Sequence, residues 1–160
     1  MEAVKDAVLS GLQGAFIHSE PMVILEGLTP EVARKTSSGF DHSCWDLLHH
    51  TVIWNDIFLG NIKGNIENWN PENNWPIQIE QENDSVFYDL INRFEGQLNE
   101  VRSLVQQPII SFSKKQKIST NSDHELSIIK LYMTIIQHIS YHIGQIACVR
   151  RMVDNWPLEE

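Results

Sequence analysis

The chain has 160 residues, close to the commonest size of one domain, and we predict a single domain over residues 1–160. Its 42% hydrophobic and 21% charged residues are ordinary for a globular protein and exclude disordered and fibrous classes. The net charge of −9 argues against nucleic acid and anionic membranes as partners, because phosphate binding needs clustered Lys and Arg.

Cysteine usage and hydropathy indicate the compartment. Cys44 and Cys148 are too few for a disulfide scaffold, so we expect free thiols in a reducing cytoplasm. No apolar run approaches the ~18 to 20 residues that span a bilayer. The first residues, MEAVKDAVLSGL, lack the basic flank and apolar stretch of a signal peptide, and we expect them to form a helix.

The first helical pattern covers residues 2–28. Pro21 interrupts it, which predicts a kink or a two-part helix, because the residue before a proline disfavours the helical conformation. Thr29 and Pro30 then predict the cap and first position of a short helical turn.

A second helix is predicted over residues 43–63. Ser43 and Asp46 resemble a capping box, with Asp in place of the usual Glu. The apolar stripe of this helix carries one histidine and one tryptophan, and it consists of Leu47, His50, Trp54 and Ile57.

Residues 64–83 form an unusually long connection, rich in Asn, Pro and Gly. Loops beyond ~12 to 15 residues in compact domains are usually functional or disordered. Trp69 and Trp75 argue against disorder, so we expect the segment to pack over something. It is long enough to cross a bundle, which allows the helices on either side of it to run parallel.

Two more helices complete the pattern, over residues 85–107 and 123–153. The start of the fourth is predicted from Ser122 and Glu125, which form a full S-x-x-E box. The basic stretch before it, SFSKKQK, is interpreted as a helix cap or a solvated loop. Four long helices and almost no strand predict an all-α four-helix bundle.

Three of the seven histidines have the spacing that metal binding needs. His138 and His142 are four residues apart, so both rings project from one helix face, at the edge of the apolar stripe. His50 lies on the stripe of the second helix. Such a pair is weak by itself, and packed histidines without metal are the alternative. Three neutral imidazoles would leave open coordination positions, the pattern of catalytic sites.

Two segments resemble the signature helices of the DinB/YfiT-like metalloenzymes: GFDHSCWDLLHHTVIWNDI and QHISYHIGQIACVRRMV. The second, with H-x-x-Y-H-x-G-Q-I, is the more specific, and the S-x-W-x-L-L-x-H pattern of the first selects His50, not His49. The resemblance implies a bundle with helices running up, down, down, up. It also implies a divalent ion, nickel or zinc most often, held by His50, His138 and His142.

Several functions stay open. Characterised members of the family that the chain resembles are thiol-dependent transferases and isomerases, which implies a small-molecule substrate and a low-molecular-weight thiol. Hydrolysis by a metal-bound water is the nearest rival, and a non-catalytic metal-binding stress-response module is another. The resemblance also implies a homodimer, which the sequence supports weakly through apolar Ile128, Ile135 and Val149.

Other polar residues have two interpretations each, and no catalytic acid or base is assigned. Gln145 lies at i+3 from His142 and either orients its ring or caps neighbouring polar groups. Asp46 either orients His50 or acts as a base, or it caps the helix. Arg150 and Arg151 favour the helix dipole, and one of them is a candidate to hold the carboxylate of a thiol. We expect Trp54 in the core, and no site role for His18, His42, His49 or His124.

Overall fold

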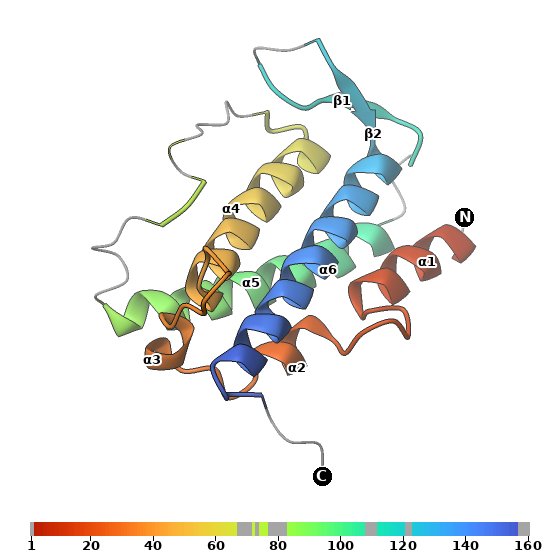
Figure 1. The fold of residues 1–160 in the computed structure, drawn as a ribbon. Helices are drawn as coiled ribbons and strands as arrows, with labels where there is room; N and C mark the ends of the chain where they lie inside the picture. Colours follow the sequence, from red (N-terminus) through yellow and green to blue (C-terminus); the bar gives the residue numbers. More distant parts are fainter. Residues whose placement is uncertain are drawn as a thin grey trace.

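The computed structural model describes residues 2–66, 72, 74–76, 83–107, 112–120 and 123–156, and nearly all of their regular structure is helical (Figure 1). The all-α class is therefore confirmed, with one small exception, a ribbon of two three-residue strands. The elements in chain order are α1 (Glu2–Leu12), α2 (Pro21–Leu25), α3 (Pro30–Ala33), α4 (Cys44–Lys63), α5 (Asp84–Gln106), β1 (Lys115–Lys117), β2 (Glu125–Ser127) and α6 (Ile128–Met152).

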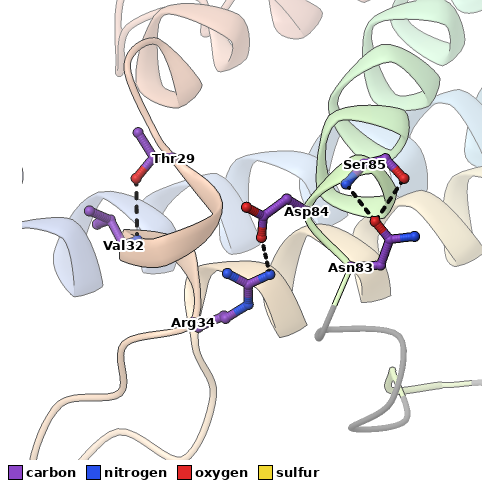
Figure 2. A network of polar contacts seen from close by, with 6 residues as sticks. All are labelled: Thr29, Val32, Arg34, Asn83, Asp84 and Ser85. Atoms are coloured by element: carbon purple, nitrogen blue, oxygen red, sulfur yellow. Dashed lines mark hydrogen bonds and ion pairs between the residues drawn. The ribbon is translucent and has the colours of Figure 1, made fainter.

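The predicted helix over residues 2–28 is divided into two parts, α1 and α2, and the break is wider than the proline alone predicts. Helix α1 ends at Leu12, and α2 begins at Pro21. Between them the backbone turns through left-handed conformations, with φ of 92° at Gly14 and 65° at Phe16. The predicted cap of α3 is confirmed, because the Thr29 hydroxyl accepts from the Val32 N–H (Figure 2).

Local signals set both ends of α4. The Ser43 side chain accepts from the Asp46 N–H and the Asp46 carboxylate accepts from the Ser43 N–H, so the predicted capping box is confirmed. The helix ends at Lys63, and Gly64 follows in the left-handed conformation with φ of 85°. Asp46 therefore serves as a capping residue.

Two glycine substitutions are expected to change stability in opposite directions. Gly64→Ala should lower the free energy of unfolding by about 1 kcal/mol, because a Cβ disfavours positive φ. Gly96→Ala should raise it by ~0.5 to 1 kcal/mol, because Gly96 is an exposed position inside α5 where a Cβ meets nothing within 4 Å. Urea unfolding of both variants measures this, and shifts of the same sign would contradict it.

The predicted start of the fourth helix is wrong. Ser122 lies outside the described residues, and Glu125 is the first residue of strand β2. Strand β2 pairs antiparallel with β1. Lys115 and Lys117, in the segment interpreted as a cap or solvated loop, belong to β1. The helix begins only at Ile128, whose N–H donates to the Lys114 carbonyl. A β-ladder thus takes the place of the S-x-x-E box.

Helices α4 and α5 run parallel, as the long connection allows. Trp45 near the start of α4 packs on Phe87 near the start of α5, with ring centroids 5.0 Å apart. At the other ends Lys63 pairs with Glu100 at 2.8 Å. Arg34 after α3 pairs with Asp84, the first residue of α5, which fixes this end of the helix (Figure 2).

Helix α6 packs along α4 in the opposite direction (Figure 1). Cys44 at the start of α4 lies near the Ile146 carbonyl, toward the end of α6, whereas Asn61 at the end of α4 contacts Ile118 beside the β-ribbon. Helix α1 packs against α5 and α6. No helix in the described ranges is long and apolar enough to cross a membrane.

The apolar residues that suggested a dimer belong to the core. Ile128, Ile135 and Val149 are 2%, 0% and 0% exposed. They pack against the other helices of the same chain, so the sequence argument for a second copy on this face is wrong.

Candidate metal centre

Three histidines from two antiparallel helices lie together. His50 projects from α4, and His138 and His142 project from consecutive turns of α6. One nitrogen from each ring lies within 4.8 Å of the others. The Nε2 atoms of His50 and His138 are 3.1 Å apart. The structure thus brings together the three residues that the sequence singles out.

Two of the rings are oriented by oxygen atoms on the side away from the cluster. His50 Nδ1 lies 3.2 Å from the carbonyl oxygen of Asn74, and His142 Nδ1 lies 2.7 Å from Gln145 Oε1. These oxygens can only accept, so each Nδ1 carries the hydrogen and each Nε2 keeps its lone pair. The interpretation of Gln145 as an orienting residue is therefore confirmed.

The residues present fit a divalent ion. A tetrahedral ion with bonds of about 2.0 to 2.1 Å holds its ligand nitrogens about 3.4 Å apart, close to the 3.1 Å between His50 and His138. His138 Nδ1 is buried without a hydrogen-bond partner among the described residues. Imidazoles suit first-row divalent metals generally, so the donor set is compatible with metal binding and leaves the metal open.

Burial keeps the cluster neutral. Desolvation, with smaller contributions from neighbouring histidines, lowers the pKa of His138 from 6.5 to about 3. Desolvation also lowers the pKa of His142 to about 4, and the pKa of His50 is lowered for the same reason. Neutral imidazole is the form that binds metal, so the ligand atoms stay available well below neutral pH.

These shifts predict an acid-sensitive fold for the metal-free protein. Between the folded pKa values and 6.5 the unfolded chain binds more protons, so the stabilisation is present above pH 6.5 and is lost as the pH falls through this window. Urea unfolding at about pH 7.5 and about pH 4.5 measures it. His138→Gln should lose less stability on acidification than the unchanged protein; an equal loss would contradict the prediction.

Aromatic side chains surround the histidines. Trp54 has its ring centroid 6.2 Å from those of both His50 and His138, and Phe58 lies 5.9 Å from His138. Trp54 is only partly buried, so its interpretation as a core residue is wrong. Tyr141 is 63% exposed and stands edge-on to His142.

His42, for which the sequence predicts no site role, also lies beside the cluster. Trp75 stacks on His50 with ring centroids 4.5 Å apart, and His42 stacks on Trp75 at 3.7 Å. The expectation that the long connection packs over something is thus confirmed for Trp75, whereas Trp69 lies outside the described residues. His42 has no helical spacing to the other histidines, so spacing does not predict that it lies near them. The only related feature in the sequence is the long connection with its tryptophans.

Comparison with known families decides the identity of the domain. A sequence profile of the DinB superfamily matches residues 22–146, most of the chain. The chain belongs to the DinB superfamily. The match extends from α2 into α6 and includes all three clustered histidines. No curated protein and no solved structure is significantly similar to the chain.

Arg150 and Arg151, the two adjacent arginines at the end of α6 in this DinB domain, differ in role. Arg150 is 2% exposed, and its guanidinium donates to the carbonyls of Ile24 and Glu26 and to Asn155. It is therefore engaged in the fold and is not free to hold a substrate carboxylate. Arg151 is exposed and lies over the Trp156 ring at 4.0 Å.

The remaining histidines and the cysteines are not part of the histidine cluster. His18 Nε2 is 3.0 Å from the Ser140 hydroxyl, and His124 is exposed. His49 is partly buried next to His50 but is not part of the cluster. The cysteines are free, with Cys44 buried and Cys148 exposed. Burial raises the pKa of the Cys44 thiol to about 12, which makes it a poor nucleophile.

Proposed function

We propose that this DinB superfamily member is a metal-dependent enzyme that activates a low-molecular-weight thiol for transfer to a small electrophile. The observation that carries the proposal is the convergence of His50, His138 and His142. Within the described residues the group contains three neutral ligands and no carboxylate. Three protein ligands are typical of catalytic sites, where a further position is open to substrate.

The chain's own residues would bind the metal ion and orient its ligands. A divalent ion, for which we propose nickel or zinc, supplies Lewis acidity that lowers the pKa of a thiol or a water molecule. Asn74 and Gln145 hold two imidazoles with Nε2 toward the centre, and the rings of Trp54 and Trp75 lie beside His50. In a substitution, the thiol sulfur forms a bond to the electrophilic carbon, the leaving group takes its electron pair, and the thiol proton passes to solvent. In an addition to an unsaturated carbonyl, the sulfur forms the same bond, the C=C π electrons move toward the carbonyl, and the neighbouring carbon takes up the proton.

Two alternatives differ in what the protein consumes. A hydrolase using a metal-bound water would cleave an ester or amide with no thiol present. A non-catalytic metal-binding stress-response module would bind the ion and consume nothing. Hydrolysis needs a general acid or base beside the ion, and within the described residues the group that could hold the ion consists of histidines alone.

Conjugation assays test the proposal. Protein loaded with Zn²⁺ or Ni²⁺ is mixed with several small thiols and a panel containing an aryl halide, an epoxide and an unsaturated carbonyl. We expect loss of free thiol that stops in metal-free protein and in His142→Ala, and persists in His124→Ala. Ester cleavage without thiol would favour the hydrolase, and metal binding with no turnover would favour the stress-response module.

We further propose the family's arrangement and setting for this chain. Parallel α4 and α5, antiparallel α6 and the packing of α1 support an up-down-down-up bundle. We also propose a homodimer and a cytoplasmic location, the second supported by the free cysteines. Light scattering at micromolar concentration tests the dimer, and a clean monomer mass would reject it.

A further inference from the structure

One residue of the long connection contacts both the histidine cluster and helix α4. The backbone carbonyl of Asn74 accepts from His50 Nδ1 at 3.2 Å, and its side-chain Oδ1 accepts from Trp54 Nε1 at 2.8 Å. Trp54 follows His50 by one helical turn, so both contacts are made to the same face of α4. Asn74 thus spans two neighbouring side chains that also contact His138.

The chemistry of these groups makes each contact directional. An indole N–H can only donate, and a partly buried one needs an acceptor. A peptide carbonyl can only accept, so the His50 contact requires the hydrogen on Nδ1 and leaves the lone pair on Nε2. That lone pair faces His138, whose Nε2 is 3.1 Å away. The hydrogen bond from Trp54 therefore holds in place the carbonyl that selects the tautomer of His50.

Trp75 reinforces the arrangement from the adjacent position. Its ring stacks on His50 with an interplanar angle of 19° and a centroid distance of 4.5 Å. His42 covers its other face at 10°. Stacking fixes the plane of the imidazole, while the Asn74 carbonyl fixes its proton.

We propose that Asn74 is a positioning residue, anchored by the Trp54 indole N–H, that holds His50 as the Nδ1–H tautomer with Nε2 ready to bind a metal ion. The role in metal binding rests on the function proposed above, whereas the tautomer does not. Outer partners of ligand histidines typically contribute a factor of ~10 to 100 in metal affinity.

The first test needs no metal. Long-range proton–nitrogen NMR spectra of the metal-free protein, labelled with ¹⁵N at histidine, report which nitrogen of His50 is protonated. We expect a single Nδ1–H tautomer in the unchanged protein. Trp54→Phe and Asn74→Leu should give a mixture of tautomers, while Asn74→Asp, which keeps an acceptor oxygen, should retain the single form. An Nε2–H tautomer in the unchanged protein would overturn the proposal.

The second test is Zn²⁺ affinity, measured by competition with a chromogenic chelator. Trp54→Phe and Asn74→Leu should each bind about 10 to 100 times more weakly, and the double variant no more weakly than either alone. Phe58→Leu is the matched control, since it removes a neighbouring ring that makes no hydrogen bond, and it should bind normally.

The outcomes separate this proposal from the metal hypothesis. Normal tautomer and normal affinity in both Trp54→Phe and Asn74→Leu would overturn the positioning role while the metal site stands. Tautomer mixing in the variants, with no Zn²⁺ binding by any form of the protein, would support the positioning of His50 and reject the metal site. Thermal unfolding of each variant confirms that it is folded before its tautomer is read.

Discussion

His142→Ala should lower the affinity for Zn²⁺ by at least about 100-fold, beyond the range expected for losing only an outer partner of a ligand. The variant removes the Nε2 atom whose lone pair is directed away from Gln145 toward the cluster. Two imidazoles on different helices would remain, too few to hold a divalent ion in competition with water. Metal content of protein purified without a histidine tag, together with chelator competition, measures the effect.

Two matched variants make this result interpretable. His49→Ala removes the histidine adjacent to His50, and His124→Ala removes an exposed one at the edge of β2. Both should keep their metal. Loss of metal in all three variants together would indicate general misfolding, and retention in His142→Ala would leave the packed-histidine interpretation standing.

Arg150→Ala should lower the free energy of unfolding by about 3 kcal/mol, because several hydrogen bonds to one buried cation are lost together. The guanidinium joins the end of α6 to the carbonyls of Ile24 and Glu26 and to Asn155. Its removal leaves acceptors in a buried region without donors. Arg150→Lys should recover only part of the loss, since a single ammonium group cannot reproduce the planar fork. Urea or thermal unfolding gives the comparison.

Arg151→Ala is the control at the adjacent position. Its side chain is exposed, and its contacts are with the Trp156 ring and, at 3.4 Å, the Ala147 carbonyl. We expect a change within about 0.5 kcal/mol, as for most surface substitutions. Equal effects at the two positions would mean that Arg150 does not join α6 to α2 as its hydrogen bonds indicate.

The helical class, the limits of α4 and α5, and the pairing of His138 with His142 could be predicted from local patterns in the sequence, whereas the choice of His50 over His49 was implied by the family resemblance. Those features depend on interactions over three or four residues, such as the Ser43–Asp46 box and the His138–His142 spacing. Gln145 could be predicted for the same reason, since its position at i+3 from His142 sets its reach. Periodicity and capping are local, and the sequence displays them directly.

Only the tertiary structure decided the features that join distant segments. The pairing of β1 with β2 overrides an S-x-x-E box, because the ladder uses backbone groups of Glu125–Ser127 that an earlier helix start would need. From the sequence alone, Arg150 could equally lie in solvent at the end of a helix. In the structure, the carbonyls of Ile24 and Glu26 lie beside its guanidinium.

The same distinction holds within the candidate site. The sequence by itself determined which imidazoles share a helix face, since a helical repeat fixes the direction of side chains. It did not determine the proton position on His50, or that His42 and Trp75 stack beside it. Those depend on how a long connection returns across α4, and such a path is fixed by contacts between residues far apart in the chain, for which no local pattern exists.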